Sequence, residues 1–352
     1  MSPRGSAKEA GIEGQPVRRA ARKYPTRPAT RRAYSATRDL DGTLASVTVN
    51  RGALSRVVAI ANGKGGVGKT SLATTLAGMA AEAGYMILLI DLDPQGNIGE
   101  DLGYTGAGLG DEGAALVGAL AAGLPLTVPV SRARPDIDVI SGGERLDDLA
   151  GLLLSRHRNG QPVADVLAEP LAEMLELNEY DLVIIDSPPG EPNLQLLALG
   201  AARWLIIPTR GDASSLKGML RIVQRLVEAR THNPNLELLG VVLFDIASSA
   251  TRLKREISKQ ITDALGGVAP LFENSIRHSI AATDARGNGL LIHEHASKLE
   301  GEPFWKALRE GRRPASPGTA PALAGDYAAL AHEILVRISE LEAPESAAVV
   351  RA

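Results

Sequence analysis

The sequence predicts an α/β fold, a doubly wound and mostly parallel sheet with helices on both faces. From Arg56 onward, short apolar segments alternate with longer helical ones, which is the pattern of right-handed strand–helix–strand crossovers. The apolar segments are rich in Val, Ile and Leu and do not alternate with polar residues, as expected for strands covered on both faces. A glycine-rich turn follows the first of them, in the place where such sheets bind phosphates.

The individual elements are predicted from these segments in chain order. The expected strands are 57–62, 87–91, 137–140, 182–186, 205–208 and 238–244, with a further short strand near 290–293. The expected helices are 69–83, 162–177, 192–202, 216–230, 252–265 and 326–341. Leu330, Ile334 and Ile338 recur every four residues in the last helix, so we expect this face to dock on the sheet. The glycine-rich residues 103–113 are expected to form a surface loop.

Charge is distributed unevenly along the 352 residues, whose net charge is −3. Residues 1–56 contain twelve Lys or Arg and four Asp or Glu, so this part carries +8 and the remainder −11. Prolines are interspersed among these arginines, and few large apolar residues are available to bury. We therefore expect a basic, disordered arm over 1–52 and one folded α/β domain over 53–342, with a Pro/Gly/Ala linker at 311–325 and a disordered tail at 343–352.

Composition excludes several classes of protein. Without cysteine the chain has no disulfides, thiolate metal sites or iron–sulfur clusters, which favours a cytoplasmic location. Aromatic residues make up only 3% of the sequence, which argues against a base-stacking platform for single strands. The longest apolar run, around 114–128, is interrupted by glycine and proline and is too short to span a bilayer.

The strongest motif is the sequence GKGGVGKT, which follows the first expected strand and opens the first expected helix. It matches the P-loop pattern G-x-x-x-x-G-K-[ST], whose backbone N–H groups surround phosphate oxygens. We expect Lys69 to reach the β- and γ-phosphates of ATP and the Thr70 hydroxyl to bind Mg²⁺. The full set of expected nucleotide-binding residues is Gly63, Lys64, Gly65, Gly66, Val67, Gly68, Lys69, Thr70 and Ser71.

Three aspartates lie at the ends of expected strands, at the edge of the sheet where α/β proteins bind ligands. Asp91 ends the strand in LLIDLDPQGN and is expected to face the Mg²⁺ region, and Asp93 begins the next loop. Asp186 follows four apolar residues in DLVIIDSPPG, which is the form of a Walker B strand whose carboxylate holds Mg²⁺. Thr70, Asp91 and Asp186 are therefore the expected metal ligands.

These motifs together resemble those of the ParA/MinD superfamily, the P-loop ATPases with a deviant Walker A motif, and most of all the ParA partition proteins. The similarity runs from about Val57 to Glu300 and again over the last helix. It implies that Lys64 crosses a dimer interface to the partner's nucleotide, and that Asp93 orients or activates the attacking water. Lys64, Lys69 and Asp93 are then the catalytic residues of a Mg²⁺-dependent ATPase that forms a homodimer when ATP is bound.

The resemblance further implies non-specific binding to double-stranded DNA, a ParB-type adaptor protein and partition of a plasmid or chromosome. Such a protein would be cytoplasmic and associated with the nucleoid. DNA affinity requires cations, but the segment near 275–286 departs from the usual family form and has alanine where a second arginine is expected. The candidate DNA contacts are Arg252, Lys254, Arg255, Arg277 and Arg286. Each could equally lie on a solvated helix face, and the basic arm is expected to compensate.

Two alternative functions stay open. A MinD-like ATPase acting at the membrane would need a basic amphipathic helix at the C-terminus, but the residues here are acidic. An ATPase that positions a protein assembly would have the same catalytic motifs.

His293 and His295 could suggest a metal site, but no third ligand lies nearby in the sequence, and we expect a structural role for them.

Overall fold

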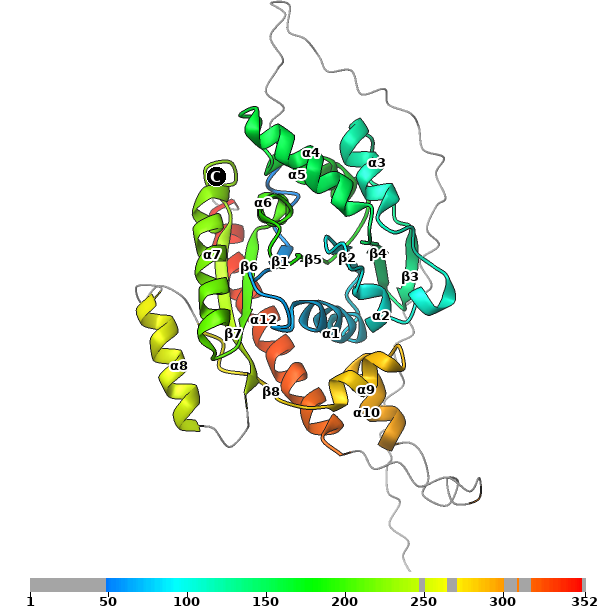
Figure 1. The fold of residues 1–352 in the computed structure, drawn as a ribbon, viewed down its shortest axis with the longest axis vertical. Coiled ribbons are helices and arrows are strands. Elements are labelled where there is room, and N and C mark those ends of the chain that lie inside the picture. Colours follow the sequence, from blue (N-terminus) through cyan, green and yellow to red (C-terminus); the bar gives the residue numbers. More distant parts are fainter. Residues whose placement is uncertain (1–48, 247–250, 265–270, 301–308, 310–317, 350–352) are drawn as a thin grey trace, which may run out of the picture. The chain divides into compact units, whose positions relative to one another are not determined.

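The computed structural model describes residues 49–246, 251–264, 271–300, 309 and 318–349, which all fall within one compact unit. Its centre is an eight-stranded sheet in the order β3-β4-β2-β5-β1-β6-β7-β8 (Figure 1). The strands are β1 Val57–Ile60, β2 Ile87–Asp91, β3 Val130–Arg134, β4 Ile137–Ile140, β5 Leu182–Asp186, β6 Trp204–Thr209, β7 Glu237–Ile246 and β8 Ile276–Arg277. All neighbouring strands are parallel except β3 and β4, which confirms the predicted doubly wound fold.

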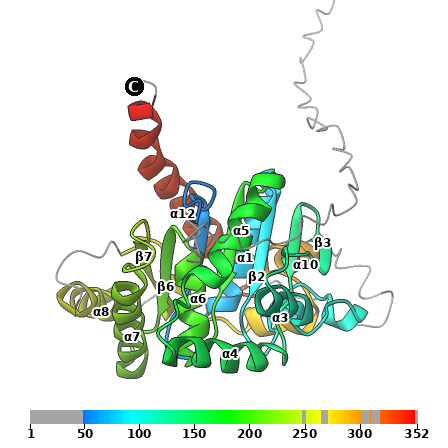
Figure 2. The same ribbon diagram turned by 90° about the horizontal axis from the view of Figure 1, so that it is seen from above.

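Helices cover both faces of this sheet (Figures 1 and 2). They are α1 Lys69–Glu82, α2 Ile98–Asp101, the 3-10 helix η1 Thr105–Ala107, α3 Ala114–Ala122, α4 Leu146–Arg158, α5 Asp165–Leu177, α6 Pro192–Ala201, α7 Ala213–Ala229, α8 Thr251–Ala264, α9 Ala281–Gly287, α10 Ile292–Glu300 and α12 Ala320–Val349. Helices α3 to α8 contribute to one hydrophobic core, and α1, α2, α9, α10 and α12 contribute to the other. Leu330, Ile334 and Ile338 are buried in the second core, so the last helix docks as predicted.

The central strands place the motifs of the sequence at one edge of the sheet. Strand β5 lies between β2 and β1, and its register pairs Asp186 with Asp91 on one side and with Ile60 on the other. The P-loop begins directly after β1. Because these three strands run in parallel, their carboxyl ends bring the P-loop and the two aspartates together.

Several expectations for individual elements were wrong. Residues 290–293 form no strand, because a turn leads there into α10, and Glu294 accepts the backbone N–H of Leu291 near the start of this helix. Helix α5 begins at Asp165 rather than at 162. Helix α12 begins at Ala320 and continues to Val349, through part of the expected linker and most of the expected tail. Residues 1–48 of the expected arm and 310–317 of the expected linker lie outside the described residues.

The few described residues ahead of β1 pack against the sheet and helices. Leu54 is buried, and the guanidinium of Arg51 donates to the carbonyl of Gly200 and to Asp165. The expected boundary of the arm at residue 52 therefore falls within a segment that contacts the folded unit. None of the helices in the described part of the chain is both long and apolar enough to cross a membrane.

Candidate nucleotide site

The loop between β1 and α1 adopts a conformation that requires glycine. Gly66 and Gly68 have φ angles of 71° and 87°, in the left-handed region that other residues rarely adopt. Gly68 is the N-cap of α1, and a side chain there would overlap the ring of Phe244 at the end of β7. This contact between distant segments was not predicted from the sequence. The loop presents the start of a 14-residue helix to the edge of the sheet, a favourable position for an anion.

Lys69 is the first residue of α1 and is only 6% exposed. Its ammonium donates to the carbonyl oxygen of Lys64, at 3.1 Å. Burial lowers the pKa of Lys69, while the charges of Asp186 and Asp93 act in the opposite direction. Among the described residues this ammonium has one hydrogen-bond acceptor, which is uncharged, so contact of Lys69 with the phosphates of ATP stays a prediction.

Thr70 and Asp186 meet directly. The Thr70 hydroxyl donates to Oδ2 of Asp186 at 2.6 Å, and the other carboxylate oxygen is buried without a hydrogen-bond partner among the described residues. Burial raises the pKa of Asp186 to about 7, against the opposing effects of the Thr70 hydrogen bond and the charge of Lys69. An unpartnered, fully buried carboxylate oxygen beside a threonine hydroxyl fits a divalent cation with oxygen ligands, such as Mg²⁺.

The two aspartates of the second motif differ in their surroundings. Asp91 is fully buried, and its carboxylate accepts the backbone N–H groups of Asp93 at 2.9 Å and of Ile98 at 3.3 Å. Burial, and after it the charge of Asp186, raises the pKa of Asp91 well above its ordinary value. In the structure Asp91 thus holds its own loop together, and direct metal binding by this residue stays a prediction. Asp93 is 6% exposed and accepts the N–H of Gln95 at 3.0 Å.

Lys64 points away from its own phosphate loop and contacts the start of α7. Its ammonium lies 2.8 Å from Oδ1 of Asp212 and 3.3 Å from the Ser215 hydroxyl. Asp212 is the N-cap of α7, and its carboxylate also accepts the N–H and hydroxyl of Ser215. The Lys64–Asp212 pair was not predicted from the sequence, although Asp212 by itself is recognisable as an N-cap residue at the start of a helix.

The five candidate DNA contacts fall into two groups. Arg252, Lys254 and Arg255 lie on α8, where the side chain of Arg252 is 93% exposed and pairs with Glu256 one turn away. Arg277 instead forms two hydrogen bonds with the carboxylate of Asp326, at 2.6 and 2.7 Å. Arg286 forms an ion pair with the buried Asp101. The last two arginines therefore already have carboxylate partners, and a role of any of the five in DNA binding stays a prediction.

His293, Glu294 and His295 lie in the first turns of α10 and point to separate contacts. His293 is 3.5 Å from Glu82, Glu294 pairs with Arg134, and His295 is buried. Within the described ranges, no group of three His, Cys, Asp or Glu side chains is arranged to hold a metal ion.

The sequence of this chain is similar to those of known ATPases. A family model described as an AAA domain matches residues 55–238. The chromosome-partitioning ATPase Soj of Thermus thermophilus is 32% identical over 286 residues, which cover 81% of this chain and 97% of that protein. The chromosome partitioning protein ParA of Caulobacter vibrioides is 30% identical over 261 residues, which cover 72% of this chain and 93% of that protein.

A solved structure with a related fold contains both nucleotide and metal. Cobyrinic acid a,c-diamide synthase from Mycobacterium smegmatis, with bound ATP analogue and magnesium, aligns with a TM-score of 0.54 and 24% sequence identity. The alignment covers 74% of this chain and 98% of that one. At this level of identity the likeness shows the fold alone.

Proposed function

Because the chain belongs to the family of ATPases that includes Soj and ParA, we propose that it is a dimer-forming ATPase that partitions a plasmid or chromosome. In this proposal ATP binding produces a homodimer that holds double-stranded DNA without sequence preference. A ParB-type partner then stimulates hydrolysis and release. The protein would act on the nucleoid.

The observation that supports this proposal best is the meeting of Lys69, Thr70 and Asp186 beside the P-loop. Lys69 would contact the β- and γ-phosphates, while Thr70 and Asp186 would hold Mg²⁺. A metal ion held by these two residues would supply positive charge beside the phosphates during the reaction. The start of α1 would add backbone N–H groups to the same phosphates.

Asp93 would position the attacking water and accept its proton. Its carboxylate is almost buried and lies close enough to Lys69 to influence that residue's pKa. A fixed carboxylate near the phosphates can contribute through both orientation and proton acceptance.

Lys64 would link ATP binding to dimer formation. Its ammonium is held by Asp212 and Ser215 in this structure, so it must exchange these contacts for phosphate oxygens of a partner's nucleotide. A cation supplied in this way stabilises transition-state charge in the manner of an arginine finger. The nucleotide would then make more contacts in the dimer than in the monomer. Such a difference is required if ATP binding is to shift the equilibrium between the two states.

Two substitutions test the proposal. Asp93→Ala should lower the ATPase rate at least about 100-fold while leaving an ATP-dependent dimer, measured by light scattering after size-exclusion chromatography. Lys64→Ala should bind ATP as a monomer. Lys217→Ala, which removes an exposed lysine from α7, serves as the control and should behave like the unmodified protein. An Asp93→Ala protein that hydrolyses ATP normally, or a Lys64→Ala protein that still dimerises, would contradict these roles.

A further inference from the structure

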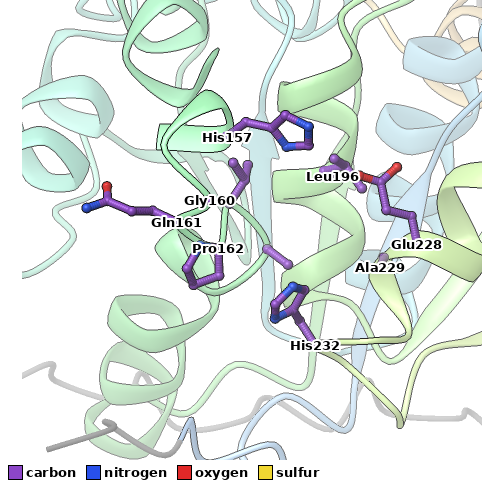
Figure 3. Close-up of a pocket in the computed structure, with 10 residues that line it drawn as sticks. His157, Gly160, Gln161, Pro162, Leu196, Glu228, Ala229 and His232 are labelled. Atoms are coloured by element: carbon purple, nitrogen blue, oxygen red, sulfur yellow. The ribbon is translucent and has the colours of Figure 1, made fainter. Parts of the chain in front are cut away.

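A polar cleft lies between α6, α7 and the connection from α4 to α5. It consists of two adjoining cavities of about 190 and 250 Å³, which share His157, Leu196 and Glu228 as lining residues. Figure 3 shows His157 and His232 at two ends of one cavity, with Leu196 and Ala229 between them. Nothing in the nucleotide site accounts for this cleft, because none of the nucleotide-binding or metal-binding residues lines it.

The charge that lines this cleft is mainly positive. Arg221 and Arg225 lie one turn apart on α7 and both face the second cavity. Neither side chain has a hydrogen-bond or ion-pair partner in the described part of the chain. Glu228 is the only acidic residue among those that line the two cavities.

The surroundings of Arg225 disfavour its positive charge, which a bound anion would stabilise. Burial lowers the pKa of Arg225, Glu228 acts in the opposite direction, and the neighbouring charge of Arg221 lowers it further. Two like charges one turn apart on a helix destabilise each other, and a bound carboxylate would relieve this repulsion.

The floor of the cleft is apolar. Leu196, Ala229, Ala164 and Val163 line it and are each less than 10% exposed. A ligand that fills the cleft therefore needs apolar groups next to its negative charges. The mixture of buried apolar surface with unpaired arginines is common at protein interfaces, where arginine is enriched among the residues that dominate affinity.

We propose that this cleft is a docking site for an acidic segment of a partner protein, with carboxylates for Arg221 and Arg225 and an apolar side chain between α6 and α7. Each cavity is smaller than the roughly 300–1,000 Å³ of typical small-molecule sites, but can take individual side chains. Duplex DNA is a rigid, convex ligand that would not reach the apolar floor, and the exposed cations of α8 suit it better.

The first measurement is the binding of a fluorescein-labelled peptide of alternating glutamate and leucine to the full chain, followed by fluorescence polarisation. We expect the double variant Arg221→Ala/Arg225→Ala to weaken this binding by about tenfold or more. Arg145→Ala, which removes an exposed arginine on the far end of α4, should bind as the unmodified protein does. The matching peptide of glutamine and leucine should bind more weakly than the acidic one.

A second measurement locates the peptide. Hydrogen–deuterium exchange should slow in 159–164 and in the second half of α7 when the acidic peptide is added. Equal peptide affinity of the double variant and the unmodified protein would overturn the proposal, as would protection confined to other segments. A double variant that loses duplex DNA binding but keeps peptide binding would identify the cleft as a nucleic-acid surface instead.

Discussion

The carboxylate of Asp186 is placed to bind a metal ion, but its burial destabilises the folded protein when no metal ion is bound. The fold buries its carboxylate completely between β2 and β1, and within the described part of the chain only one of its oxygens has a hydrogen-bond partner. Such a site is suited to a cation. In the metal-free protein, however, a buried charged carboxylate lowers the free energy of unfolding. We expect this cost to appear in the stability of the unliganded protein.

The free energy of unfolding of the metal-free protein should depend on the protonation of Asp186. Its folded-state pKa of about 7 lies above the ordinary value of 3.8, so the folded state binds the proton more tightly than the unfolded state. The resulting stabilisation is complete below pH 3.8 and is lost as pH rises through 7. Asp186→Asn should reduce this pH dependence, leaving the part that is due to Asp91, and should stabilise the protein at pH 8 in EDTA by about 1–3 kcal/mol.

Urea unfolding at several pH values measures this effect. Asp263→Asn, at an exposed position on α8, is the control and should leave the pH dependence unchanged. If Asp186→Asn lowered stability at pH 8, the account of an uncompensated buried charge would be wrong.

At the scale of single residues, the sequence predicted which side chains would meet but not their other partners. Lys69, Thr70 and Asp186 come together because the P-loop and the Walker B strand are recognisable motifs at the carboxyl ends of β1 and β5, which are neighbours in the sheet. The Lys64–Asp212 contact and the packing of Phe244 on Gly68 join segments more than 100 residues apart. No local pattern specifies such contacts, so only the folded structure reveals them.

At the scale of elements, α9 is tied to α1 and α2 through one arginine. Arg286 of α9 pairs with Asp101 of α2 and lies 3.3 Å from the Ser71 hydroxyl of α1. Asp101 also accepts the hydroxyl of Thr74 at 2.9 Å. This network gives Arg286 a structural role, whereas Arg252 on α8 lies almost fully in solvent.

Arg286→Ala and Arg252→Ala should therefore have different effects. Loss of Arg286 leaves the buried Asp101 carboxylate without this hydrogen-bond donor and should lower the free energy of unfolding by about 1–3 kcal/mol. Arg252→Ala should change stability by less than about 0.5 kcal/mol and weaken DNA binding. Chemical denaturation and gel-shift titration measure the two quantities. The structural role of Arg286 would be wrong if Arg286→Ala left the free energy of unfolding unchanged and reduced only DNA affinity.

Prediction of elements was best for the strands of the sheet centre, which are continuous runs of buried apolar residues. The short apolar run at 290–293 was assigned wrongly because periodicity cannot distinguish a short strand from the start of a helix. Helix α4 was missed, although Leu146, Leu149 and Leu153 are buried at helical spacing. The antiparallel strand β3 at the sheet edge was missed because only Val130 in it is fully buried.

At the scale of the whole molecule, the basic residues ahead of the folded unit should contribute to DNA binding. Residues 1–48 carry ten Lys or Arg, and counterion release makes DNA affinity depend on such charges. Arg51 contacts Gly200 and Asp165, so a deletion should stop at residue 48. Deletion of 1–48 should lower DNA affinity by about tenfold or more and flatten its salt dependence.

Titration with random-sequence duplex DNA at several salt concentrations measures both effects. A deletion variant whose affinity and salt dependence match those of the full chain would show that the basic segment plays no part in DNA binding. The ATPase rate without DNA should be the same for both proteins, because none of the candidate nucleotide-binding, catalytic or metal-binding residues is among those deleted.

Co-sedimentation with random-sequence duplex DNA tests whether ATP controls the binding of the protein to DNA. The purified protein would be compared with ATP, with ADP and without nucleotide, at two salt concentrations. The account predicts binding that requires ATP and weakens as salt rises. Absence of binding in every state, in a protein that still hydrolyses ATP, would contradict it and favour a role in positioning a protein assembly.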